Sequence, residues 1–145
     1  MRYLALCLLC TLALPAAALT RGTTQLGQAF VSGGITPDEI ATIKDEGKQY
    51  SVAVLTVAKG TGAYLADVHV TIVDKDDRAV LDTMMDGPWL LVNLPAGHYK
   101  LNAEYDGVKQ QRPIAVKAED HQRLEFTFDT HDEVEKPASA PDSGS

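Results

Sequence analysis

Between residues 50 and 128 the chain alternates apolar and polar side chains with a period of two, which is typical of half-buried β-strands. Turn signals such as Asp106-Gly107 interrupt the alternation about every 8–12 residues. This pattern predicts about seven short strands in a sandwich or barrel. The expected strands are 50–58, 67–73, 79–84, 89–94, 98–105, 108–117 and 123–128. The residues expected to point into the core include Val68, Val70, Ile72, Tyr99, Leu101, Ala103, Tyr105, Leu124, Phe126 and Phe128.

One helix is predicted ahead of the strands, over residues 36–49. Thr36 is suited to the N-cap, Pro37 to the first helical position, and Glu39 completes a capping box with Thr36. Gly47 marks the end of the helical pattern. The apolar stripe of this helix is narrow, so it needs a surface to lie against.

The strand at 89–94 predicts where that surface is. Because side chains alternate along a strand, Trp89 and Leu91 point away from the core when Leu90, Val92 and Leu94 point into it. The first strand is also apolar on a second face, assigned to Tyr50, Val52 and Val54. Such a face should not stand open to water. Either the helix covers it with Ile40 and Ile43, which we prefer because the helix is adjacent in sequence, or a partner does.

The first residues have the features of a cleavable signal peptide. Arg2 precedes an apolar run, and small residues end at Ala18, after which cleavage is expected. The run is too short for a transmembrane anchor, and no other stretch could span a membrane. We therefore expect a periplasmic protein. Its mature form would contain no cysteine, since Cys7 and Cys10 both lie in the signal.

The rest of the chain divides by composition. The expected segments are a signal peptide at 1–18, an extended lead-in at 19–35 with a possible strand at 28–31, the helix at 36–49, the sandwich at 50–129 and a disordered acidic tail at 130–145. The net charge is −7 and no cluster of Lys and Arg is present, which argues against nucleic acid as a partner.

Several motifs resemble a known family. The stretches that carry the resemblance are 64–72, Asp86-Gly87, Leu94-Pro-Ala-Gly-His-Tyr-Lys-Leu101 and Tyr105-Asp-Gly107. They resemble the carboxypeptidase regulatory-like domains, over residues 51–128. The resemblance implies an all-β fold, a seven-stranded prealbumin-like (transthyretin-like) β-sandwich, here with one N-terminal helix packed on an outer face. The chain departs from the family pattern where the turn is compressed to Asp86-Gly87-Pro88 and where Trp89 replaces Phe or Tyr.

The segment Ser32-Gly-Gly-Ile-Thr-Pro-Asp-Glu39 is also similar to one found upstream of such a domain in a group of short exported proteobacterial proteins. Neither resemblance implies a particular activity, since in metallocarboxypeptidases this domain is an accessory to the enzyme. Transthyretin-like hydrolases of a urate-derived substrate carry a C-terminal Tyr-Arg-Gly-Ser signature, which this sequence lacks.

The sequence offers few candidate residues for catalysis or metal binding. Outside the tail the mature chain has only Ser32 and Ser51 as serines, and neither lies in a nucleophile elbow. A metal site would need neighbouring strands to bring together His69 and His98, which both face outward. The acidic run 74–77 lacks the later Gly and Glu of an EF-hand loop and is expected to be a solvated turn. We therefore expect no catalytic residues, no metal and no cofactor.

These observations favour a non-enzymatic exported module that binds or scaffolds an envelope component, an unknown protein or glycan. Its candidate contact surface is Tyr64, Asp86 and Trp89. The alternative is a protein that binds carbohydrate or a peptidoglycan fragment by stacking on Trp89 and nearby tyrosines. A small hydrolase is the third hypothesis.

Overall fold

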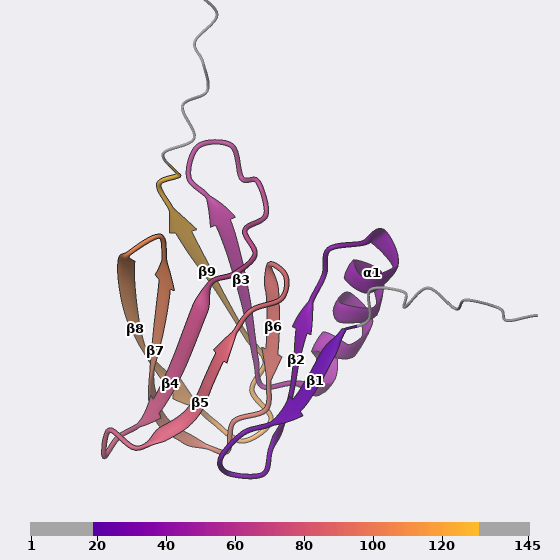
Figure 1. The fold of residues 1–145 in the computed structure, drawn as a ribbon. Helices are drawn as coiled ribbons and strands as arrows, with labels where there is room; N and C mark the ends of the chain where they lie inside the picture. The colour runs from indigo at the N-terminus through magenta and orange to yellow at the C-terminus, as the bar shows by residue number, and fades with distance from the viewer. Residues whose placement is uncertain (1–18, 131–145) are drawn as a thin grey trace, which may run out of the picture.

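The computed structural model describes residues 19–130, so the expected signal peptide and acidic tail lie outside the described residues. Two β-sheets face each other (Figure 1), a five-stranded sheet in the order β1-β2-β6-β3-β9 and a four-stranded sheet in the order β5-β4-β7-β8. The strands are β1 (Thr20–Thr23), β2 (Ala29–Gly33), β3 (Val52–Ala58), β4 (His69–Asp74), β5 (Ala79–Met84), β6 (Trp89–Val92), β7 (Gly97–Tyr105), β8 (Val108–Val116) and β9 (Gln122–Phe128).

The main core lies between the two sheets and confirms the alternation predicted for the later strands. Val68, Val70 and Ile72 are fully buried, with Leu101 of β7 beside Ile72 in the same sheet and Phe126 of β9 in the opposite sheet of the same core. The Asp106-Gly107 hairpin joins β7 to β8, with both residues at positive φ. The all-β sandwich predicted from the sequence is therefore confirmed.

The described residues form nine strands rather than the expected seven. The two additional strands are β1 and β2, in the segment expected to be an extended lead-in, and β2 overlaps the short strand considered there at 28–31. They form an antiparallel hairpin, and β2 pairs with β6 from Phe30↔Val92 to Gly33↔Trp89. The sequence did not reveal this hairpin because both strands are short and rich in Gly, Thr and Ser, with little apolar alternation.

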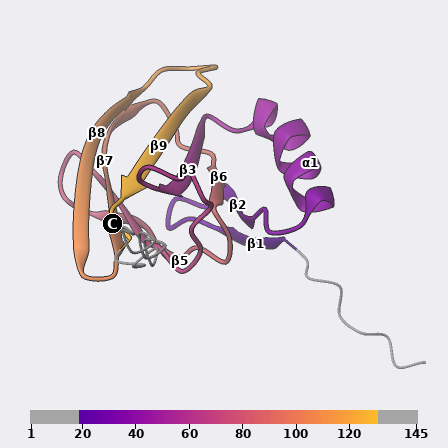
Figure 2. The same ribbon diagram turned by 90° about the horizontal axis from the view of Figure 1, so that it is seen from above.

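The predicted helix is present as α1 (Pro37–Glu46), followed by the single 3₁₀ turn η1 (Gly47–Gln49). Its capping box forms as expected: the Thr36 hydroxyl accepts from the Glu39 backbone N–H, and the Glu39 carboxylate accepts from the Thr36 backbone N–H. Figure 2 shows α1 lying against the outer face of the five-stranded sheet, on the side away from β7 and β8.

A second apolar cluster lies between α1 and this sheet. Its buried members are Val31, Ile43, Leu55, Val57, Trp89 and Leu91. The prediction that the helix covers Trp89 is confirmed, with Ile43 as the fully buried contact and Ile40 only half-buried.

The assignment of Val52 and Val54 to the outer face is wrong. Both lie in the main core, and the outer residues of β3 are Ala53, Leu55 and Val57. The reason is that β3 is a central strand covered on both sides, so both of its faces are apolar and alternation does not reveal which face is which. The pairing of β3 with β6 determines which face is which. Val52 lies opposite Val92 and Val54 opposite Leu90, and both partners belong to the main core.

Candidate functional site

The three residues of the predicted contact surface lie in different environments. Tyr64 is 53% exposed and forms an isolated bridge with Val57 at the end of β3. Asp86 is exposed, and its backbone N–H donates to the Ser32 hydroxyl at 3.0 Å. Trp89 is only 6% exposed, because it packs beneath α1. The exposed part of the predicted surface is therefore Tyr64 and Asp86, and Trp89 belongs to a different site.

The approach to Trp89 depends on glycines that precede α1. A Cβ atom at Gly34 would lie 2.7 Å from Trp89 Cδ1, and Gly34 has φ of +94°. A Cβ atom at Gly87 would collide with the carbonyl of Gly33. The Glu39 carboxylate accepts from the N–H groups of Ile35, at 3.0 Å, and Thr36, at 2.9 Å, so these amides at the helix N-terminus already have an anionic partner. The glycines thus serve close packing.

Beside Trp89 the surface is hollowed into a groove of about 390 Å³, which we call the α1 groove. One wall comes from α1 and η1, the floor from β3 and β6, and the other wall from His121 and the first two residues of β9. Its lining residues are Ile43, Lys44, Gly47, Lys48, Tyr50, Ala53, Trp89, Leu91, His121, Gln122 and Arg123.

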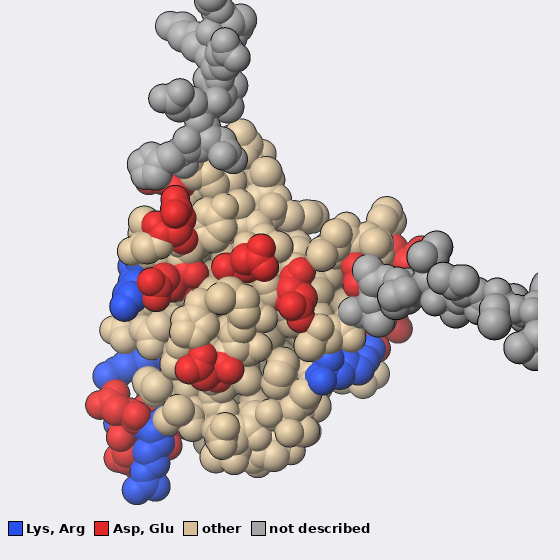
Figure 3. Space-filling model, viewed as in Figure 1, with Lys and Arg blue, Asp and Glu red and all other residues tan. Residues whose placement is uncertain are grey.

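The floor of the α1 groove is apolar and its rim is cationic. Lys44, Lys48 and Arg123 are exposed on the rim, and the exposed His121 lies beside Arg123. No Asp or Glu lines the groove, although the chain carries 20 acidic residues against 13 Lys and Arg. On the face drawn in Figure 3, in contrast, acidic side chains are scattered over the sandwich.

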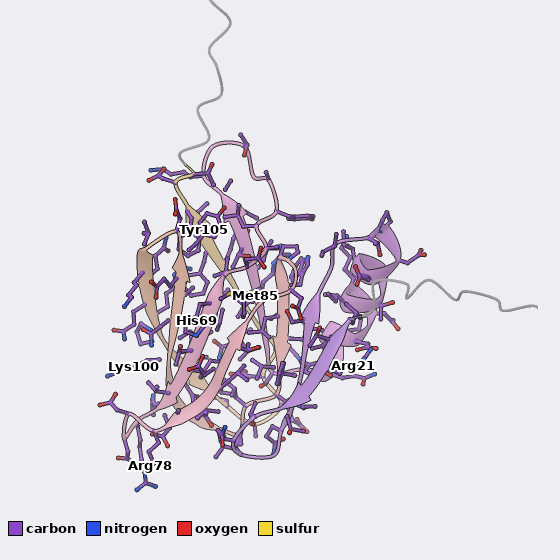
Figure 4. The ribbon with its side chains drawn as sticks, viewed as in Figure 1. Arg21, His69, Arg78, Met85, Lys100 and Tyr105 are labelled. Atoms are coloured by element: carbon purple, nitrogen blue, oxygen red, sulfur yellow. The ribbon has the colours of Figure 1, made fainter. Side chains whose placement is uncertain are left out.

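The nearby acid of α1 is already paired. Arg21 of β1 donates to both Glu46 carboxylate oxygens, at 2.9 and 2.7 Å. This hydrogen-bonded pair lowers the pKa of Glu46 and raises that of Arg21. Figure 4 places Arg21 on the α1 side of the molecule, where the pair ties β1 to the C-terminal end of the helix.

The wall that carries Arg123 is held in place by hydrogen bonds. The Gln122 side chain donates to the carbonyl of Ala115 in β8 and to Asp120. The His121 ring nitrogen Nδ1 lies 2.8 Å from the carbonyl oxygen of Tyr50. This wall is therefore tied both to the four-stranded sheet and to the start of β3.

Trp89 carries an unusual polar atom. Among the described residues, its Nε1 is the one buried side-chain nitrogen or oxygen with no hydrogen-bond partner. A buried donor left unpaired costs about 1–3 kcal/mol. The guanidinium carbon of Arg123 lies 5.0 Å from the centre of the Trp89 ring, which places a cation over the ring.

The candidate metal and catalytic residues have other roles. His69 lies opposite Glu104 on β7, six positions from His98, so the two histidines are about 20 Å apart along the sheet. His69 instead contacts Asp82 on β5, at 2.5 Å, and Figure 4 shows it on the outer side of β4. Within residues 19–130 no three metal-ligating side chains come together.

The buried serines serve the backbone. The Ser51 hydroxyl accepts from the Leu94 N–H at 2.8 Å and lies within 3.2 Å of the Leu94 carbonyl.

The acidic run 74–77 forms an exposed turn. The Asp74 carboxylate accepts from the backbone N–H groups of Asp76 and Arg78, which stabilises the turn.

Sequence reasoning identified Trp89 but missed the α1 groove. Lys44 and Lys48 follow the i, i+4 spacing that puts them on one helix face, which was visible in the sequence. Nothing in the sequence indicated that Arg123, more than 70 residues later, would face them. That neighbourhood follows from the parallel pairing of β3 with β9, which sets Ala53 beside Arg123.

The comparison with known families agrees with the fold. The sequence profile of the carboxypeptidase regulatory-like domain matches residues 54–129. Among solved structures, the 5-hydroxyisourate hydrolase of Klebsiella pneumoniae is similar, with a TM-score of 0.45, 20% sequence identity, and coverage of 55% of this chain and 90% of that chain. No curated protein matches. In the described part of the chain, no helix is long and apolar enough to cross a membrane.

Proposed function

We propose, from the premise that this chain belongs to the carboxypeptidase regulatory-like domain family, that it is a non-catalytic exported module. Its task would be to bind a component of the cell envelope in the α1 groove. The family gives the framework of this proposal but no site, because a fold by itself does not specify a function.

The observation that carries the proposal is where the groove lies. The family match begins at residue 54, so β1, β2, α1 and η1 all lie before it. Of these elements, β1 and β2 extend the five-stranded sheet, and α1 packs on its outer face, leaving Tyr50, Ala53 and Leu91 lining a groove beside the helix. An apolar hollow with a few polar groups is the usual form of a ligand site. This chain therefore adds a pocket of its own to the family's sandwich.

A non-catalytic role is favoured by the contacts of the reactive groups. The buried Ser51 hydroxyl accepts a hydrogen bond from the backbone N–H of Leu94. The Ser32 hydroxyl accepts one from the backbone N–H of Asp86. The contact between His69 and Asp82 resembles part of a catalytic triad, but a triad needs a nucleophile in reach of the histidine. The neighbouring hydroxyl, on Thr71, lies two positions along β4 and has no such hydrogen bond.

Stacking of a sugar on Trp89 has less support than binding in the groove. Stacking needs an open ring face. Arg123 lies over the Trp89 ring, and the edge at Cδ1 lies against Gly34. Tyr64 is exposed, but it projects from the loop after β3 and does not line the groove.

The test begins with export and ends with binding. The full chain, produced in a Gram-negative host, is expected in the periplasm with an N-terminus at Leu19, and an unprocessed cytoplasmic chain would contradict export. Native mass spectrometry of the periplasmic protein is then expected to show a bound molecule. Ala53→Phe should lose it by filling the groove floor. Thr71→Phe, the matched change on the outer face of the other sheet, should keep it.

The two variants show whether the molecule binds in the α1 groove. If Ala53→Phe melts like the parent protein and still carries the bound molecule, the groove is not its site. If neither the parent nor Thr71→Phe carries any molecule after gentle extraction from the envelope fraction, the binding role itself is contradicted.

A further inference from the structure

We propose that the α1 groove selects a small anionic amphiphile, a molecule that joins one carboxylate, sulfonate or phosphate group to an apolar ring or chain. This inference rests on the proposed function, because it names the chemical class of ligand for the same groove. The evidence is the separation of charged and apolar groups within the groove.

The cationic side chains come from both walls. Lys44 and Lys48 lie one helical turn apart along α1 and η1, and Arg123 stands across the floor on β9. None of the three has a carboxylate within 4 Å among the described residues. Lys100 shows the contrast, because it is paired with Asp77 at 3.3 Å. The rim therefore keeps its positive charge available in a chain whose net charge is −7.

Charge alone would bind an anion weakly here, because exposed ion pairs in water contribute about 0–1 kcal/mol. The apolar floor of the groove adds binding free energy that the charged rim alone does not provide. Tyr50 and Ala53, which are only partly buried, offer apolar surface between the two walls, and burying apolar area contributes about 25 cal/mol per Å². A ligand that places its apolar part on this floor brings its anionic group to the rim.

The size of the groove favours a small molecule over a polymer. Its volume of about 390 Å³ is near the lower end of ordinary small-molecule pockets, which span about 300–1,000 Å³. Glu125, the neighbouring outward acid on β9, does not line the groove.

A matched pair of fluorescent probes tests the charge preference. The probes are 8-anilinonaphthalene-1-sulfonate and N-phenyl-1-naphthylamine, which share one aromatic skeleton and differ by the sulfonate. We would titrate each into the chain from residue 19 onward, which includes every described residue. We expect saturable binding of the sulfonate, about tenfold tighter than that of the neutral probe, and weaker binding as salt is added.

Variants locate the probe and separate the two proposals. The double variant Lys44→Gln/Lys48→Gln should bring the affinity for the sulfonate close to that for the neutral probe. Lys75→Gln, at an exposed turn on the other sheet, should change nothing. Ala53→Phe should abolish binding of both probes, and a melting curve for each variant shows that it is folded.

Equal affinity for the two probes, lost in Ala53→Phe, would overturn the charge preference and leave the groove as a binding site. Sulfonate binding that survives Ala53→Phe would overturn the inference by placing the probe elsewhere. Absence of binding by either probe would also overturn it. In each case the bound molecule sought by native mass spectrometry decides the proposed function separately.

Discussion

Arg123 reaches over the ring of Trp89 although a whole strand, β3, separates β9 from β6. The contact is diagonal, because Ala53 of β3 pairs with Arg123 on one side and with Leu91 on the other, whereas Trp89 pairs with Leu55, two positions along β3. The Ala53 side chain is a single methyl group, so it leaves space beside Arg123 for the guanidinium group to extend toward the Trp89 ring. The same small side chain leaves the floor of the α1 groove open. One alanine in the middle of the sheet thus permits both the contact and the cavity.

The single tryptophan of the chain makes this contact observable. Trp89 is only 6% exposed, so its emission should be shifted to shorter wavelength than that of a solvated indole, with weak quenching by iodide. Arg123→Ala should increase iodide quenching, because it uncovers one face of the ring and leaves the fold intact. Lys75→Ala is the control. Emission like that of free tryptophan in the parent protein would mean that α1 does not cover this face.

Docking of α1 should depend on Ile43 far more than on Ile35. Ile43 is 1% exposed in the cluster beneath the helix, whereas Ile35 is 62% exposed. Ile43→Asp removes a buried side chain and places a carboxylate in an apolar site, so we expect a loss of about 3–5 kcal/mol in the free energy of unfolding. Ile35→Asp should cost less than about 0.5 kcal/mol. Urea unfolding measures both, and similar small losses would contradict the packing.

The Arg21–Glu46 pair should contribute a pH-dependent part of the stability. The pKa of Glu46 is lowered in the folded protein, chiefly by its hydrogen bond to Arg21. Its contribution is therefore complete above the ordinary glutamate pKa of about 4.3 and is lost as the pH falls through the lower folded value. The pair is partly exposed, so the contribution should be below about 1 kcal/mol.

Arg21→Gln tests this pH dependence. The variant should be less stable than the parent near pH 6, and the difference should shrink as the pH approaches about 3. Glu46→Gln should show the same reduced slope of stability against pH, and the double variant should resemble either single one. A stability difference that stays constant over this range would show that Arg21 acts by packing and not through the charge of Glu46.

The sequence predicts the strands of the sandwich well because their periodicity carries the information. Val68, Val70 and Ile72 alternate with polar residues, since one face of β4 is buried and the other meets water. Where a strand is buried on both faces, as β3 is, the alternation disappears and the faces are assigned wrongly. Strands as short as β1 leave too few residues for any period to show.

The candidate site was harder to predict, for a different reason. The capping box at Thr36 and Glu39 is local, so the helix start could be derived from neighbouring residues. The α1 groove is made by residues that meet only through long-range pairing, with Lys48 on one wall and Arg123 on the other. Neither the parallel pairing of β3 with β9 nor the path of η1 follows from local pattern. Sequence reasoning therefore reached the tryptophan without the cavity beside it.

The turn before α1 offers a comparison that separates backbone strain from close packing. Gly34 and Gly27 both have positive φ, +94° and +76°. A Cβ atom at Gly34 would lie 2.7 Å from Trp89 Cδ1 and 3.2 Å from Ile43 Cδ1, whereas at Gly27 it would meet nothing within 4 Å. Alanine at either position bears the cost of a left-handed conformation, about 1 kcal/mol.

Only at Gly34 must the indole also move, and overpacking typically costs a further 1–3 kcal/mol or so. We therefore expect Gly34→Ala to lose about 1–3 kcal/mol more than Gly27→Ala in urea unfolding. Gly34→Ala should also shift the Trp89 emission to longer wavelength, which Gly27→Ala should not do. Equal losses with unchanged emission would mean that the turn tolerates a side chain there. The glycine would then be needed for its backbone conformation and not for the approach of Trp89 to the helix.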